Sequence, residues 1–321
     1  MSKKDFTYAV SRIRMKENLL FSAKTIDRLI AAPDYDSLVR TLAELGYGSD
    51  KDDKEQDIIS LEQKKLWSLM GELTDDMDVF NVFRIQNDFH NIKASVKALY
   101  TNTSPESMFV SGGTVSPQKL YDAAKKRDYS DVAPEFAEAL DEALNTILKT
   151  GDGQLCDIIV DKACLNAVFE IGEKSDVKAI KDYAEVFVAS SNIKIAFRGA
   201  KLNKSRDFFS KALSRSVFDN DKLSIAAAKG TDEICDYLST TKFKDATEFI
   251  KKSMSAFEKW CDDFLINNMK PQKSEPFSAG PLVAYIIAKL NEIKSVRLIL
   301  VAKLNGLDDS KINERIREMY V

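Results

Sequence analysis

The segment NIKASVKALY, residues 91–100, has counterparts in NIKIAFRGAK, residues 192–201, and in EIKSVRLILV, residues 292–301. The isoleucines near the start of these segments are separated by 101 and then 100 residues. Each copy also carries a second basic residue about one helical turn after its lysine, and these residues are Lys97, Arg198 and Arg297. A pattern that returns twice at a nearly constant period indicates an internal repeat.

A second motif recurs with a similar period. It combines a basic residue with a leucine and small residues in segments 27–32, 118–124 and 221–227. Its leucines, Leu29, Leu120 and Leu223, are separated by 91 and 103 residues. Together the motifs predict three similar helical units, at residues 1–105, 106–205 and 206–321, with the first unit completed by the C-terminal helices.

The spacing of apolar residues predicts helices through most of the chain. Steps of four and three residues place one set of side chains on a single helix face, and this set is Ile85, Phe89, Ile92, Val96 and Leu99. Segments 61–100, 135–149, 175–200, 245–268 and 281–305 have the same kind of pattern. Only 12 glycines and 7 prolines occur in 321 residues, which favours long helices with few tight turns. We therefore expect an all-α fold.

The repeat leaves two arrangements open. Each unit exposes an apolar face that its neighbours must cover, and three units can pack in a line or around an axis. The segment Ser11-Arg12-Ile13-Arg14 resembles the first motif and is a candidate for a fourth, diverged copy of it. If the first and last helices complete one unit together, the array closes into a ring or funnel.

Composition excludes several classes of protein. The chain has 47 basic and 50 acidic residues, so its net charge is −3. A chain of this charge has no strong positive field that would attract nucleic acid or an anionic membrane. The single histidine, His90, excludes a metal site built from two or three histidines of this chain. The four cysteines form no CxxC motif and are expected to be reduced cytoplasmic thiols. We expect no cofactor, metal or small-molecule substrate.

No membrane span or signal peptide is expected. The longest clean apolar run, residues 282–288, is far shorter than the roughly 20 residues that a spanning helix requires. The first six residues lack the apolar core of a signal peptide. Any membrane association is therefore expected to occur through a partner protein.

The basic residues of the repeat have two interpretations. Lys93 and Lys97, like Lys194 and Arg198, are four residues apart and share one helix face. Their stems can cover apolar core while their charges stay in water. Alternatively, they form a polar lining that contacts a partner, which the recurrence of the charge favours. The candidate interface residues are Arg12, Arg14, Lys93, Lys97, Lys194, Arg198, Lys294 and Arg297.

Both ends of the chain resemble one known family. Segment 280–306, which begins Gly280-Pro281-Leu282, and the ending INERIREMYV, residues 312–321, are similar to the C subunit of the prokaryotic V-type (A/V-type) ATPase. That protein is equivalent to the d subunit of the vacuolar enzyme. Segment 8–14 resembles the opening helix of the family. The likeness covers the chain in length and order, and it is loosest over residues 101–150.

The resemblance implies a funnel-shaped, all-α subunit with three similar helical subdomains around a pseudo-three-fold axis. It implies a rotor subunit without catalytic residues, held peripherally on the cytoplasmic side of the membrane. Such a subunit seats the central-stalk subunits on the proteolipid ring and transmits torque for proton or sodium transport. It binds no nucleic acid. The eight basic residues are then expected to line the funnel interior or its rim, where they meet an acidic stalk tip or fix the packing of the units.

Two other functions remain as alternatives. A helical-repeat adaptor unrelated to ATPases would use a concave surface, with its chain ends far apart. An enzyme could use the carboxylates Asp75, Asp76 and Asp78 in a pocket with perturbed acids. These carboxylates fall between two predicted helices, where an exposed helix cap is the simpler interpretation.

Overall fold

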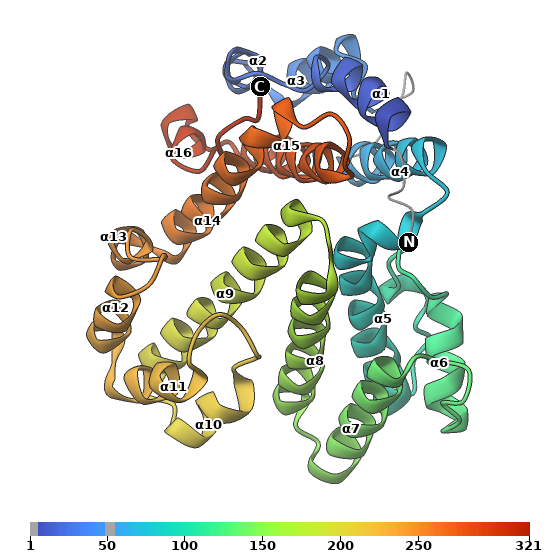
Figure 1. Cartoon of the computed structure of the whole chain (residues 1–321), viewed down its shortest axis with the longest axis vertical. Coiled ribbons are helices and arrows are strands. Elements are labelled where there is room, and N and C mark those ends of the chain that lie inside the picture. Colours follow the sequence, from blue (N-terminus) through green and yellow to red (C-terminus); the bar gives the residue numbers. More distant parts are fainter. Residues whose placement is uncertain (1–5, 49–54) are drawn as a thin grey trace. The chain divides into compact units, whose positions relative to one another are not determined.

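The computed structural model describes residues 6–48 and 55–321 and is drawn in Figure 1. These residues form sixteen α-helices, three short 3-10 helices and no strand, which confirms the all-α prediction. Contacts divide the chain into two compact units. Unit 1 comprises residues 1–77, 177–179 and 248–321, and unit 2 comprises residues 78–176 and 180–247.

Unit 1 combines the two ends of the chain. From the N-terminal side it contains α1 (Thr7–Glu17), α2 (Ala23–Ile30), α3 (Tyr35–Glu44) and α4 (Glu55–Leu73). From the C-terminal side it contains α14 (Met254–Met269), η3 (Lys270–Ser274), α15 (Gly280–Leu304) and α16 (Asp309–Asn313). The short helix α13 (Ala246–Lys252) leads from unit 2 into this part of unit 1.

Unit 2 holds the middle of the chain. After η1 (Met77–Phe80) it contains α5 (Asn81–Thr101), η2 (Glu106–Met108), α6 (Pro117–Lys126) and α7 (Pro134–Thr150). It continues with α8 (Gly153–Lys174), α9 (Lys178–Lys201), α10 (Arg206–Ala212), α11 (Asn220–Lys229) and α12 (Thr231–Ser239).

Helix boundaries follow local capping chemistry. The side chains of Asp34, Asp152 and Asp219 accept hydrogen bonds from backbone N–H groups in the first turns of α3, α8 and α11. These bonds satisfy donors that have no partner within the helix. Gly151 ends α7 with φ +66°, a left-handed conformation that glycine adopts without a steric penalty. Gly151 and Asp152 alone separate α7 from α8.

Three pairs of consecutive α-helices contain the repeat, α4 with α5, α8 with α9 and α14 with α15. The repeated motif lies in the second helix of each pair. In unit 2, α8 packs against α5, the motif helix of the preceding pair. In unit 1, α4 packs against α15, the motif helix of the last pair in the chain. Within each unit, therefore, the first helix of one pair packs against the motif helix of another pair.

The first residue of the motif is a buried polar clamp. In α5, Asn91 donates to the Val110 carbonyl at 3.0 Å and accepts from the Val110 N–H at 2.9 Å. In α9, Asn192 makes the same two bonds to Ser214, at 2.8 and 3.1 Å. Both asparagines are fully buried. Each clamp therefore fixes the loop that follows its own helix, a few residues before the second repeated motif.

The third clamp joins the two ends of the chain. Glu292 in α15 accepts a 2.6 Å hydrogen bond from the N–H of Phe21, in the segment that leads to α2 and Leu29. Helix α1 also packs against α15, and apolar residues from both chain ends form one core cluster. The open array of chain ends far apart is not found within unit 1. The boundaries of the three sequence units, the pseudo-three-fold axis and the funnel stay predictions.

We predict that Asn192→Ala lowers the free energy of unfolding by about 1–3 kcal/mol, because it leaves the buried N–H and hydroxyl of Ser214 without their acceptor. Asn91→Ala should have an effect of similar size. Urea unfolding followed by circular dichroism measures both. The control is Asn87→Ala, one turn earlier in α5, whose bond to the Ser111 carbonyl is exposed. An equal loss in the control and in Asn91→Ala would contradict the clamp.

Candidate functional site

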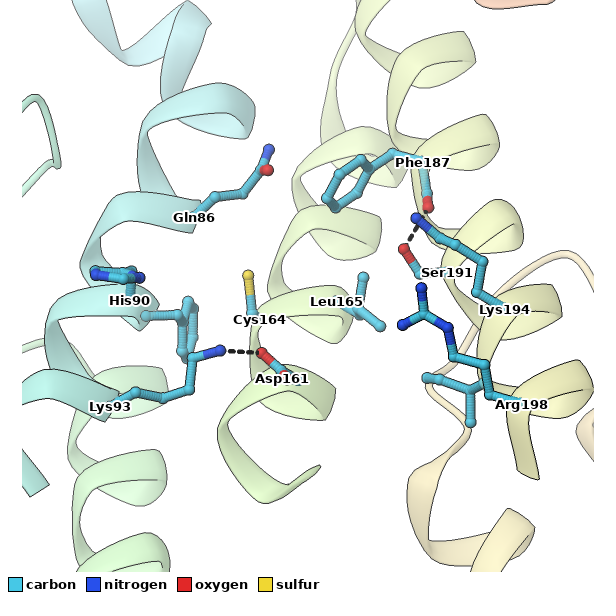
Figure 2. Close-up of a pocket in the computed structure, with 12 residues that line it drawn as sticks. Gln86, His90, Lys93, Asp161, Cys164, Leu165, Phe187, Ser191, Lys194 and Arg198 are labelled. Carbon is cyan, nitrogen blue, oxygen red and sulfur yellow. Dashed lines mark hydrogen bonds and ion pairs between the residues drawn. The ribbon is translucent and has the colours of Figure 1, made fainter. Parts of the chain in front are cut away.

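A groove in unit 2 contains several of the predicted interface residues (Figure 2). Its volume is about 370 Å³, and it lies between α5, α8 and α9. The α5 wall carries Gln86, His90 and Lys93, and the α9 wall carries Phe187, Ser191, Lys194 and Arg198. Helix α8 supplies Asp161, Cys164 and Leu165 between the walls. We call this site the basic groove.

The two walls are equivalent faces of two repeat copies. Gln86 and Phe187, His90 and Ser191, and Lys93 and Lys194 are each 101 residues apart, which is the period of the motif. The buried clamp residue of each helix lies on the face turned away from solvent, so the lysine two positions later emerges beside the groove in both copies. Because the lysine recurs in both copies, the basic groove has a basic residue on each side.

The cations of the basic groove differ in how they are paired. Lys93 forms a 2.7 Å ion pair with Asp161, and Lys97, one turn further along α5, lies 2.8 Å from Asp157. Both pairs hold α5 against α8. Lys194 forms no ion pair with any residue in the described ranges, and Arg198 is exposed at the α9 wall. The lining therefore carries three formal positive charges and the single negative charge of Asp161.

The cysteines and the acidic cluster show no reactive arrangement. All four cysteines are free, and burial raises the pKa of Cys164 to about 12, which keeps this thiol protonated at neutral pH. Asp75 and Asp78 are exposed, and Asp78 accepts a hydrogen bond from the Asn81 side chain. No group of three or more His, Cys, Asp or Glu side chains is placed to hold a metal in residues 6–48 and 55–321.

The remaining predicted cations lie in unit 1. Arg14 donates to the carbonyls of Gln272 and Glu275 at 2.7 and 3.0 Å and pairs with Glu17, so it fixes the loop before α15. Lys294 pairs with Asp262 at 2.9 Å. Arg297 is exposed, and it forms no ion pair within the described part of the chain. Arg12 donates to the Tyr8 hydroxyl at 2.9 Å.

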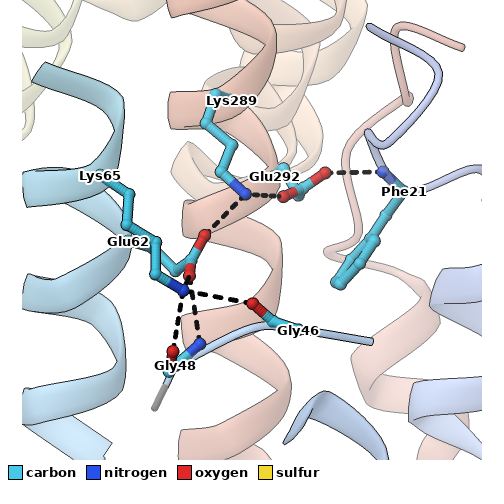
Figure 3. A network of polar contacts seen from close by, with 7 residues as sticks. All are labelled: Phe21, Gly46, Gly48, Glu62, Lys65, Lys289 and Glu292. Atoms are coloured by element: carbon cyan, nitrogen blue, oxygen red, sulfur yellow. Dashed lines mark hydrogen bonds and ion pairs between the residues drawn. The ribbon is translucent and has the colours of Figure 1, made fainter. Parts of the chain in front are cut away.

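A buried charge network in unit 1 was not predicted from the sequence (Figure 3). The Lys289 ammonium lies 2.6 Å from Glu292 and 2.8 Å from Glu62. Glu62 also accepts from Lys65 at 2.7 Å and from the Gly48 N–H at 3.1 Å. Because Glu292 holds Phe21, the network connects α4, α15 and the N-terminal segment. One signal was present, since Lys289 and Glu292 interrupt a long apolar stretch one turn apart.

Comparison with known proteins identifies the family of the chain. Residues 9–315 match the family described as ATP synthase (C/AC39) subunit. The chain belongs to this family. The likeness at the two chain ends is thereby confirmed and extends through the middle.

Relatives of known function share the length of the chain. The C subunit of the V-type sodium ATPase of Enterococcus hirae is 24% identical over 325 residues, covering 96% of this chain and 97% of that protein. The C subunit of the V-type ATP synthase of Thermus thermophilus is also 24% identical, covering 97% and 98%. The C subunit of the A-type ATP synthase of Methanocaldococcus jannaschii is 24% identical, covering 96% and 85%. The C/AC39 chain is thus placed among subunits of rotary ATPases.

In the part of this C/AC39 chain that the structure describes, no helix is both long enough and apolar enough to cross a bilayer. This agrees with the short apolar runs of the sequence. Two polar features of the described fold call for a functional or structural explanation, the basic groove and the charge network.

The pKa values of the network follow from burial and mutual attraction. Burial raises the pKa of Glu292, and the charge of Lys289 offsets this only in part. Burial alone would also raise the pKa of Glu62, but Lys289 and the hydrogen bonds from Lys65 and Gly48 outweigh it, so this pKa is lowered. Burial disfavours the Lys289 ammonium, yet the two carboxylates hold its pKa above the ordinary value. The charged forms of Glu62 and Lys289 are thus stabilised by each other, while burial works against the charge of Glu292.

We predict that Glu62→Gln lowers the free energy of unfolding by about 1.5–3 kcal/mol near neutral pH, the range for hydrogen bonds to charged groups. The folded pKa of Glu62 lies below its ordinary 4.5, so this stabilisation is present above that pH and is lost as pH falls through the lowered pKa. The difference between variant and wild type should shrink in acid. Urea unfolding across that pH range measures it.

The matched control is Glu72→Gln, on the same helix but with its side chain 62% exposed. It should change stability little at either pH. A Glu62→Gln effect that stays constant from neutral to acidic pH would show that Glu62 contributes through packing and not through its charge.

Proposed function

We propose that this C/AC39 chain is the non-catalytic rotor subunit that seats the central stalk of a V-type rotary ATPase on the membrane proteolipid ring. It transmits torque for ion transport and is held at the cytoplasmic face of the membrane through its protein partners. The observation that carries the proposal is the basic groove, a recess of about 370 Å³ with repeat-related cations, in a chain of this family.

The basic groove is suited to an acidic protein segment. Lys194 and Arg198 line one wall, and the half-buried apolar side chains of Phe187 and Ile195 line the groove beside them. Single exposed ion pairs contribute only about 0–1 kcal/mol each. Grip therefore comes from shape and apolar anchors, while the cations select an acidic partner and orient it.

A subunit that transmits torque must be rigid. The clamp side chains of Asn91, Asn192 and Glu292 are buried, so each loop is held from inside the fold. Lys93 and Lys97 add ion pairs between α5 and α8. These interactions support a rigid coupling piece and give four of the predicted interface residues, Arg14, Lys93, Lys97 and Lys294, a structural contact as well.

The family match argues against the alternative of a helical-repeat adaptor unrelated to ATPases. The first helix also packs against the last long helix, whereas the open adaptor array predicted separated chain ends. Pull-down of the tagged chain from membranes tests the proposal, with co-purification of stalk and proteolipid subunits as the expected result. Recovery of neither would contradict it.

We predict that the double variant Lys194→Glu and Arg198→Glu weakens binding of the isolated stalk about tenfold at low salt, which corresponds to about 1.4 kcal/mol. The loss should fall to a few-fold at high salt, because exposed charges are screened within a Debye length of about 10 Å or less. Titration of labelled stalk at the two ionic strengths measures it.

The control is Lys126→Glu with Lys149→Glu, two exposed lysines of the same unit outside the basic groove. It carries the same change in net charge. If this control weakens stalk binding as much as the groove variant, the effect comes from overall charge and the groove assignment is wrong.

A further inference from the structure

Helix α1 has apolar side chains on two opposite faces. Ala9, Val10 and Ile13 are buried in unit 1. On the other side Tyr8 and Met15 are 65% and 71% exposed, at a spacing that places them along one line with Arg12 between them. Leu19, which is 70% exposed, follows in the turn after the helix. We call Tyr8, Arg12, Met15 and Leu19 the α1 ridge. Large apolar side chains this exposed and this aligned mark an interaction surface.

The α1 ridge continues into a groove of about 730 Å³ in the same unit. Leu19 belongs to both, and the groove is further lined by Leu45 and Leu69. Glu62, Lys65 and Lys289 of the charge network border it, and Figure 3 shows their ion pairs. The surface therefore combines an apolar ridge with an adjoining recess whose charged border is rigidly held.

The charge of this surface is positive. Lys16 lines the groove and forms no ion pair with any residue the structure describes. Arg12 reaches Glu72 only at 3.9 Å. Lys289 and Lys65 are neutralised by Glu62 and Glu292. Glu72 also lines the groove and offsets Arg12, so among the described residues Lys16 supplies the one uncompensated positive charge at this edge. An occupant with a carboxylate next to an apolar side chain complements this edge.

We propose that the α1 ridge and its groove dock a helical end of a membrane-embedded partner subunit, one that presents a large apolar side chain beside a carboxylate. The inference rests on the proposed function and deepens it by assigning the surface toward the membrane. On its outward side α1 carries Arg12 and Lys16 beside apolar residues, a composition typical of a surface that faces an anionic membrane. The recess favours a protruding protein end over a flat lipid surface.

Rebinding to membranes stripped of this subunit tests the inference. The double variant Met15→Glu and Leu19→Glu should raise the concentration for half-maximal rebinding at least tenfold while stalk binding in solution stays unchanged. The control, Leu148→Glu with Leu202→Glu, alters two exposed leucines of unit 2 and should rebind like wild type. Thermal melts confirm that both variants are folded, and Met15→Leu, which keeps an apolar side chain on the ridge, should also rebind like wild type.

The outcomes separate the two proposals. If wild type does not rebind, the proposed function fails and the docking assignment fails with it. If wild type and the ridge variant rebind equally, only the docking assignment is wrong. A photoreactive benzoylphenylalanine at position 19 should crosslink to a membrane-embedded subunit. A crosslink to a stalk subunit, no crosslink, or equal binding to protein-free phosphatidylserine vesicles would overturn the assignment.

Discussion

The contact on which the rest of unit 1 depends is the hydrogen bond from the Phe21 N–H to the buried carboxylate of Glu292. It connects residues 271 positions apart and brings the N-terminal segment onto the C-terminal helix α15. The core cluster of unit 1 draws on both chain ends and includes Phe21 itself, so the bond reinforces the place where the two ends meet. In unit 2 the equivalent clamps hold loops only about 20 residues away. Closing these shorter loops costs less chain entropy.

The sequence allowed the helices and the positions of the clamps to be predicted, because both depend on local periodicity. Asn91, Asn192 and Glu292 were found as members of a repeat, although their role as clamps required the structure. Glu62 gave no sequence signal, since a glutamate in an amphipathic helix is ordinarily exposed and its burial is decided by the distant Lys289. Which lysines are paired was equally hidden, because Asp161 and Asp157 belong to a helix about 60 residues further along.

The basic residues illustrate why recurrence predicts a position better than a role. Lys93 and Lys194 occupy the same place in two copies and line one groove. Lys93 nevertheless has Asp161 within 2.7 Å, whereas no described residue forms an ion pair with Lys194. A shared ancestral helix face explains the common position. The neighbouring helix, which differs for each copy, decides whether the charge serves packing or is available to a partner.

The replacement of asparagine by glutamate in the third clamp explains the buried charge network. Asparagine has a donor and an acceptor, so Asn91 and Asn192 each satisfy both backbone groups of one residue and remain neutral. An ionised glutamate only accepts, and its buried charge is costly without a counter-charge. Lys289 supplies that charge, but two carboxylates share it, and Lys65 completes a neutral set of two cations and two anions. The strictly local clamp of the first two copies has thus become, where the chain ends meet, an interaction that needs α4, α15 and the N-terminal segment together.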